Sequence, residues 1–191
     1  AVDIMENDEE VAIFCCDFYI IDRESRILNK YSPSYDSIEY IGFSFFSGKR
    51  SFSELYKRGV HSCGALLRRS AIDMAGNMDV NYRIAWDCEY FLRLLGENGS
   101  YLYYYHRPLT GYRKVSNSLS TNLVQMYSEK VRIYGKIARD FPALKKELGW
   151  KANKRFALQV VSLSNAYKLK RRYEQAMWAA ITALLCYPPI I

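Results

Sequence analysis

The sequence predicts an α/β fold in which a mixed sheet with helices is followed by an all-α tail. Three observations support this. Val11–Ile21 (VAIFCCDFYII) is a continuous apolar run, typical of a strand buried on both faces of a parallel or mixed sheet. Ile84–Leu95 (IAWDCEYFLRLL) has the three- and four-residue apolar spacing of an amphipathic helix. From Asn122 onward the chain keeps that helical spacing, so we expect domains at residues 1–120 and 121–191.

The other elements expected in residues 1–120 are short and come from local patterns. In chain order they are a helix end at 1–7, a polar turn region at 22–30, irregular chain at 31–57 with a short helix at 53–57, an apolar run at 64–67, a helix at 71–75 and a helix from Trp86 to Gly96 or Gly99. Tyr101–Tyr105 is a strand by its aromatic content, and Pro108–Arg113 is a turn with a short strand. Because an open sheet needs neighbours on each side of Val11–Ile21, we expect residues upstream of Ala1 to supply further strands.

Three helices are expected in the tail. Apolar residues from Leu123 to Phe141 keep a helical spacing that ends at Pro142, and two further helices are expected at 151–168 and 171–187. Together they mark a change from mixed α/β to all-α near Ser120.

Charge divides the chain in the same way. The formal net charge is +7, but residues 121–191 hold 13 Lys and Arg against 4 Asp and Glu, a net of +9. These cations lie on amphipathic helices without a nucleic-acid recognition motif, so a nucleic-acid partner is not predicted. Basic residues Lys168, Lys170, Arg171 and Arg172 precede an apolar helix that carries Trp178, which suits an anionic membrane surface. A helix hairpin with solvated cations and a helical-repeat scaffold are the alternatives.

Cysteine usage indicates a reducing setting. The five cysteines are odd in number and form no CxxC pair, so neither a disulfide framework nor a zinc site is predicted. The longest uncharged run, Gln175–Ile191, is too short and too proline-broken for a membrane span. We therefore expect a cytoplasmic protein, peripheral to the inner face of a membrane if the tail binds lipid.

Asp87 raises the main functional question. It stands at the head of the predicted helix and shares its apolar edge with Phe91 and Leu95, so its carboxylate meets protein more than water. It is either a capping or dipole-pairing residue or a catalytic base. Glu89 points elsewhere on the helix and is expected to be solvated, whereas Cys88 is expected to be a small packing residue.

Four pieces in order resemble the acceptor-side half of a family 2 glycosyltransferase, an inverting enzyme of the GT-A fold. They are CDFYIID from Cys16, GALLRRSAIDMAGNMD from Gly64, WDCEYFLRLL from Trp86 and RPLTGYRKVSNSLS from Arg107. Asp87 lies six residues before Arg93 in a Leu-Arg-Leu sequence, which makes it the match to the family's catalytic base. The resemblance covers roughly residues 2–120.

The resemblance also implies what this chain lacks. Members of the family bind the sugar nucleotide in a half that carries a DXD metal motif, and no DXD is present here, since Asp17 and Asp22 flank a buried strand. We therefore expect Mn²⁺ or Mg²⁺ to bind the full-length enzyme through an upstream DXD, with no metal bound by this chain alone.

Five further residues are expected at the substrate site on the resemblance. Trp86 stands where the family has an acidic or amide residue before the base, Arg68 and Arg69 match its Arg-Arg-Ser helix start, and Tyr112 and Arg113 match its Tyr-Arg pair. The alternative for Arg68 and Arg69 is pairing with nearby acids or solvation. His61 is expected to be structural.

These features predict an inverting glycosyltransferase that moves a sugar from a nucleotide donor to a glycan or lipid-linked acceptor, in building a bacterial surface polysaccharide. This chain would carry the acceptor site and the base, and alone it would be inactive. The alternative is a non-catalytic interaction module whose basic helical tail binds membrane or protein.

Overall fold

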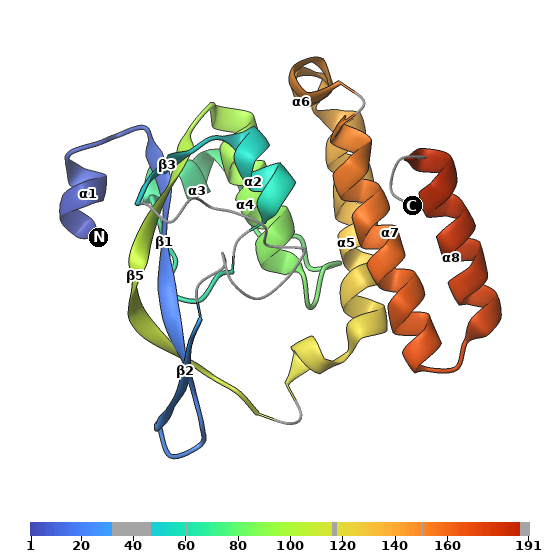
Figure 1. The fold of residues 1–191 in the computed structure, drawn as a ribbon. Coiled ribbons are helices and arrows are strands. Elements are labelled where there is room, and N and C mark those ends of the chain that lie inside the picture. Colours follow the sequence, from blue (N-terminus) through green and yellow to red (C-terminus); the bar gives the residue numbers. More distant parts are fainter. Residues whose placement is uncertain (32–46, 60, 116–117, 150, 188–191) are drawn as a thin grey trace. The chain divides into compact units, whose positions relative to one another are not determined.

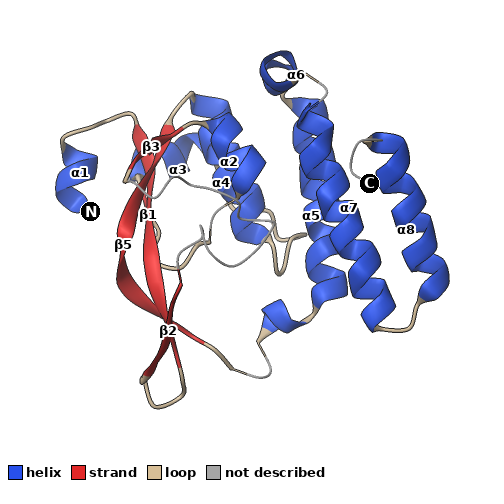
Figure 2. Ribbon diagram, in the orientation of Figure 1, coloured by secondary structure: helices blue, strands red, loops and turns tan. Residues whose placement is uncertain are grey.

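The computed structural model describes residues 1–31, 47–59, 61–115, 118–149 and 151–187 (Figure 1). The chain divides into two compact units. The first comprises Ala1–Val80 and Trp86–Ser118, and the second comprises Asn81–Ala85 and Leu119–Ile191. The described strands all belong to the first unit, whereas the regular elements of the second are helices (Figure 2). The expected α/β class with a mixed sheet and helices is confirmed at this level.

The sheet of the first unit is built around β1. The strands are β1 (Val11–Ile21), β2 (Ile27–Tyr31), β3 (Gly48–Arg50), β4 (Leu66–Leu67) and β5 (Tyr101–Arg113). Their order is β2-β1-β5-β3, with β4 also beside β1. β1 is parallel to β5 and antiparallel to β2 and β4, and β3 is antiparallel to β5. Residues 11–18 are each at most 3 % exposed, which confirms the strand buried on both faces.

Helices pack against this sheet. The helices of the first unit are α1 (Val2–Glu6), α2 (Phe52–Arg58), α3 (Arg69–Ala75) and α4 (Trp86–Asn98). α4 contacts α2, α3 and β1, and α2 contacts β5 (Figure 1). The apolar face of α4 is buried there through Tyr90, Phe91, Leu94 and Leu95. The helical spacing read from the sequence is therefore the core-facing stripe of α4.

Two expectations for the first unit are wrong. Pro108–Arg113 was expected as a turn with a short strand, but β5 runs unbroken from Tyr101 to Arg113, with irregular register opposite Asp17. Residues 22–30 were expected as a turn region, but only 22–26 form the turn and β2 begins at Ile27. In both places pairing with β1 organises residues whose local pattern favours a turn. Most of the expected irregular segment, 32–46, lies outside the described residues.

The second unit is helical. After a short 3₁₀ helix, η2 (Leu119–Thr121), it contains α5 (Leu123–Asp140), α6 (Pro142–Leu148), α7 (Lys151–Leu169) and α8 (Tyr173–Cys186). α7 contacts α5, α6 and α8. The close approach of α5 to α7 needs Gly135, because a Cβ there would lie 3.3 Å from the Phe156 ring. α6 was not expected, and it starts at Pro142, a residue tolerated in the first turn of a helix. No helix among the described residues is both long and apolar enough to cross a bilayer.

Glu129 ties Asn81–Ala85 to α5. This carboxylate is buried and accepts hydrogen bonds from the backbone N–H groups of Ile84 (2.8 Å) and Ala85 (2.9 Å), and from Nε2 of Gln125 (2.9 Å). Burial by itself raises the pKa of Glu129, but these hydrogen bonds outweigh burial and leave the pKa below its ordinary value of 4.5. Arg132 adds a cation–π contact with Tyr82 at 5.2 Å. A charged anchor on α5 thus fixes the segment that leads directly into α4.

Candidate active site

Asp87 lies in the first turn of α4. The helix begins at Trp86, so Asp87 is inside the helix and is not its N-cap residue. Its Oδ1 accepts a hydrogen bond from the backbone N–H of Cys88 at 2.8 Å, and the side chain is half-buried. The positive N-terminal end of the helix stabilises a carboxylate at this place. Of the two structural alternatives, dipole pairing fits this geometry and capping does not.

The helix that carries Asp87 packs on β1. Burial raises the pKa of the Cys15 thiol well above its usual range, and the charges of Cys16 and Asp87 raise that pKa further. Cys15 itself therefore stays protonated and is no nucleophile.

The same face of the sheet holds a buried carboxylate that sequence reasoning did not select. Asp17 is two residues from Cys15 along β1, so both side chains project to one face. Asp17 is 0 % exposed; the Tyr104 hydroxyl donates a hydrogen bond to its Oδ1, and its Oδ2 lies 3.2 Å from Nδ1 of His106. The signal available in the sequence was an acid within an otherwise apolar strand.

Together these groups can handle a proton. The His106 side chain is 23 % exposed. Its Nδ1 faces the buried Asp17 carboxylate, so Nε2, on the other side of the ring, points away from Asp17. Asp87 comes from α4, which contacts β1, and the Asp17–His106 pair comes from β1 and β5. Trp86 is half-buried beside Asp87 at the start of α4.

Arg68 makes hydrogen bonds to three backbone carbonyl groups. Its Nε donates to the carbonyl of Val11 at 2.8 Å, and its Nη2 donates to the carbonyls of Asp8 at 2.9 Å and Met5. These bonds join the start of α3 to α1 and the start of β1. The geometry therefore favours a structural role for this guanidinium over the expected substrate contact.

Arg69 and Arg113 also contact other groups of the protein. Arg69 is exposed and its Nε lies 2.9 Å from Oδ1 of Asp73, the pairing with a nearby acid that was the alternative to substrate binding. Arg113 donates through Nη1 to the carbonyls of Asp22 and Arg23, each at 2.6 Å, and so braces the turn between β1 and β2.

Tyr112 joins a small aromatic cluster. Its ring centroid lies 5.7 Å from that of Phe18 and 5.1 Å from that of His61. Nδ1 of His61 accepts a hydrogen bond from the backbone N–H of Cys63 at 3.1 Å. The structural role expected of His61 is confirmed. Tyr112 remains half-buried, and its assignment to the substrate stays a prediction.

The expectation that Glu89 is solvated is wrong. Glu89 is 1 % exposed, and its Oε1 lies 2.8 Å from Nε of Arg93. Arg93 also donates to the carbonyls of Ala75 and Asn77, and Tyr90 donates to the carbonyl of Gly76 at 3.0 Å. The turn after α3 supplies polar groups that α4 can reach, so this side of the helix is packed rather than open.

Glu89 and Asp73 each pair with an arginine four residues away, but Glu89 is buried and Asp73 is exposed. Removing the charge of each should therefore change the free energy of unfolding by different amounts. Glu89→Gln is expected to lower the free energy of unfolding by about 2 kcal/mol, because the half-buried Arg93 loses its charged partner at a buried position. Asp73→Asn, which removes the partner of the exposed Arg69, should change it by less than about 0.5 kcal/mol. Urea unfolding of both variants measures the difference. Equal effects would contradict a stabilising role for the buried Glu89–Arg93 ion pair.

The described residues do not form a metal site. Within them, no three His, Cys, Asp or Glu side chains gather in a way that could hold an ion. Asp17 already binds Tyr104 and faces His106, and both carboxylate oxygens of Asp22 accept from Arg26 (2.8 and 2.9 Å). Oδ1 of Asp17 and both oxygens of Asp22 thus accept hydrogen bonds from protein donors, and the divalent metal expected of the family is assigned to an upstream DXD.

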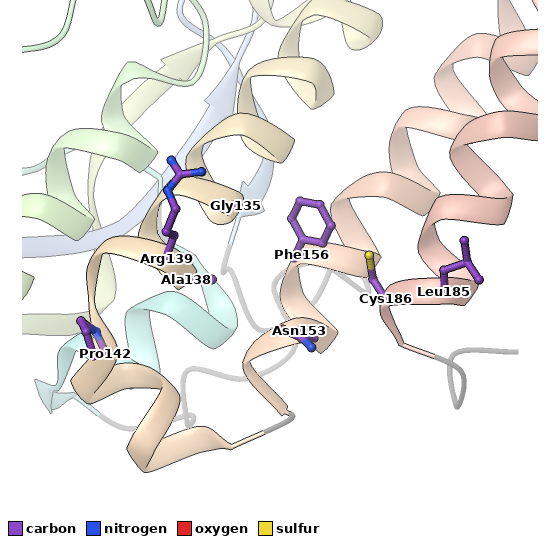
Figure 3. Close-up of a pocket in the computed structure, with 8 residues that line it drawn as sticks. All are labelled: Gly135, Ala138, Arg139, Pro142, Asn153, Phe156, Leu185 and Cys186. Atoms are coloured by element: carbon purple, nitrogen blue, oxygen red, sulfur yellow. The ribbon is translucent and has the colours of Figure 1, made fainter.

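The helical unit contains a pocket of its own. It has a volume of about 680 Å³. The side chains around it come from α5, α6, α7 and α8 (Figure 3), namely Gly135, Ala138, Arg139, Pro142, Asn153, Phe156, Leu185 and Cys186. None of the residues predicted for the substrate site lines it. Among the described residues, no Asp or Glu lines it.

No family model, no curated protein sequence and no solved structure matches this chain significantly. The resemblance to family 2 glycosyltransferases therefore stands on the residues and motifs quoted above.

Proposed function

We propose that this chain is the acceptor-side part of an inverting family 2 glycosyltransferase. The observation that carries the proposal is the place of Asp87, a half-buried carboxylate in the first turn of α4, the helix that packs on β1. The resemblance assigns the family's base to this same residue. The order of strand, Arg-Arg-Ser helix, turn and Leu-Arg-Leu helix supports it.

Asp87 acts as general base in this proposal. As the acceptor hydroxyl oxygen forms its bond to the anomeric carbon, the carboxylate takes the hydroxyl proton. The bond from that carbon to the nucleotide oxygen breaks on the opposite face, and the nucleoside diphosphate leaves with the electron pair. One displacement of this kind inverts the anomeric carbon and needs only one carboxylate.

The Asp17–His106 pair has a supporting role. The imidazole of His106 is partly exposed, and its Nδ1 lies 3.2 Å from Oδ2 of the buried Asp17 carboxylate, so its other ring nitrogen is available for a hydrogen bond to an acceptor substrate. We assign it to orienting the acceptor hydroxyl towards Asp87.

The donor side belongs to residues outside 1–191 in this proposal. Three arginines that could have met a diphosphate, Arg68, Arg69 and Arg113, are bound to carbonyl groups or to Asp73. A DXD-bearing segment with its divalent metal would supply the positive charge for the leaving group. The acceptor is a glycan or lipid-linked sugar, as in the assembly of a bacterial surface polysaccharide.

A donor and acceptor screen tests the proposal. The full-length protein is incubated with a panel of nucleotide sugars, with and without glycan or lipid-linked acceptors, and the release of nucleoside diphosphate is followed. Release that depends on an acceptor supports a transferase. A protein that binds the acceptors but releases no diphosphate with any donor favours the alternative, a non-catalytic interaction module, which the outward apolar face of α8 also fits.

A further inference from the structure

The last helix of the described chain is packed with its small residues inward. Ala176 and Ala183 are 2 % and 1 % exposed, and the Ser164 hydroxyl of α7 donates to the carbonyl of Ala176 at 2.7 Å. Trp178 and Leu185, by contrast, are 60 % and 79 % exposed. A helix that packs only on its neighbours usually buries its large apolar side chains, so α8 has this arrangement reversed.

The exposed apolar side chains form one stripe along α8. Trp178, Ile181 and Leu185 are three and four residues apart, so they share one side of the helix. Tyr173, Met177 and Leu184 lie beside them at similar spacing. The full set, here called the α8 outer face, is Tyr173, Met177, Trp178, Ile181, Leu184 and Leu185. Glu174 is the one charged residue of α8. A continuous stripe of this size is more than scattered surface apolarity.

Cations gather where this stripe begins. Lys168, Lys170, Arg171 and Arg172 are all exposed at the end of α7 and in the turn before α8. None of the four forms an ion pair within the part of the chain that the structure describes. Four uncompensated positive charges thus lie next to an exposed apolar helix face.

We propose that the α8 outer face lies in the surface of an anionic lipid bilayer, with these four cations at the lipid head groups. Trp and Tyr favour the boundary between head groups and acyl chains, and Met, Ile and Leu can enter it to a shallow depth. This inference does not depend on the glycosyltransferase proposal.

Charge decides between a lipid surface and a second copy of the chain. Residues 121–191 carry a net charge of +9, so pairing two copies through α8 would bring two strongly positive units together. An anionic bilayer compensates that charge instead. A bilayer surface also accepts a single straight helix without requiring a complementary groove.

Vesicle co-sedimentation of the 191-residue chain tests the proposal. We expect binding to vesicles of phosphatidylcholine with 30 % phosphatidylglycerol, roughly, and none to pure phosphatidylcholine, with weaker binding as salt rises and screening shortens to about 8 Å near physiological ionic strength. The double variant Arg171→Gln with Arg172→Gln should lower the partition coefficient roughly 30-fold. Trp178→Ser should lower it at least about tenfold.

Two exposed residues serve as matched controls. Lys154→Gln removes an exposed cation elsewhere on α7, and Met74→Ser removes an exposed apolar side chain of the first unit. Both should leave binding near that of the unchanged chain. Circular dichroism of each variant verifies that it is folded, as expected for substitutions of exposed residues.

Three outcomes would overturn the proposal. One is the absence of binding to anionic vesicles at low salt, and another is binding that the Arg171, Arg172 and Trp178 variants leave unchanged. The third is a concentration-dependent dimer in sedimentation velocity that Trp178→Ser abolishes, without vesicle binding, which would assign the α8 outer face to self-association.

Discussion

Asp87→Asn in the full-length protein is expected to lower sugar transfer by a factor of roughly 10² to 10⁴, the usual effect of removing a positioned general base. The substitution keeps the size of the side chain. Its amide oxygen can still accept the hydrogen bond from the Cys88 backbone N–H that Asp87 accepts at 2.8 Å. Stability should change little, and donor affinity should be unchanged because the base acts on the acceptor hydroxyl. Initial rates, donor titration and melting temperature measure the three effects.

Asp87→Ala separates catalysis from helix stabilisation. If Asp87 only pairs with the positive end of α4, Asp87→Ala lowers stability by up to about 1 kcal/mol and the folded fraction transfers sugar at the normal rate. If Asp87 is the base, both variants lose transfer, whatever their stability. An Asp87→Asn protein with near-normal turnover would exclude Asp87 as the base.

Glu129→Ala is expected to lower the free energy of unfolding by about 4 kcal/mol at neutral pH, the largest stability effect we anticipate. The variant loses three hydrogen bonds to one buried carboxylate and leaves the backbone N–H groups of Ile84 and Ala85 without that acceptor. Glu129→Gln keeps an acceptor oxygen but no charge, so about half of that loss is expected. Chemical unfolding monitored by circular dichroism measures both.

The effect should depend on pH with a definite sign. The pKa of Glu129 in the folded protein is below its ordinary value of 4.5, so its contribution is complete above about 4.5. It is lost as pH falls from there through the lowered pKa, where the folded protein too takes up the proton. The difference between the natural chain and Glu129→Gln should therefore be constant from pH 6 to 8 and shrink below about 4.5.

Asp140→Asn supplies the control for that experiment, since Asp140 ends the same helix and forms an exposed ion pair with Arg139. It should change the free energy of unfolding by less than about 0.5 kcal/mol, both between about pH 6 and 8 and below about pH 4.5. If Glu129→Gln changes the free energy of unfolding by as little as that, or by an amount independent of pH, the charged Glu129 carboxylate does not hold Asn81–Ala85 on α5 in the way described.

Much of the fold could be predicted from local sequence. The apolar run of β1 and the helical spacing of α4, α5 and α7 give the elements within a few residues of where they lie. The start of β5 at Tyr101–Tyr105 was predicted, but its continuation to Arg113 could not be, because Pro108 and Gly111 favour a turn locally and parallel pairing with β1 keeps the chain extended there. A boundary near Ser120 was predicted, but the place of Asn81–Ala85 in the helical unit was not, since this segment is bound by Glu129, far along the sequence.

The candidate site was predicted less completely. Asp87 could be selected because a helix start is a local pattern and the carboxylate follows it directly. The roles of Arg68 and Arg113 depend on backbone carbonyl groups that only the folded chain brings near. The Asp17 and His106 pair requires the parallel pairing of β1 with β5, which no local pattern records.

The anomeric configuration of the first-formed product is the most direct test of the central proposal. The full-length protein, its donor and its acceptor are followed by proton NMR from the earliest time points, before the products can equilibrate. We expect the new glycosidic bond to have the configuration opposite to that of the donor, because one base and one displacement invert the anomeric carbon. A product that retains the donor configuration would contradict the single-carboxylate mechanism assigned to Asp87.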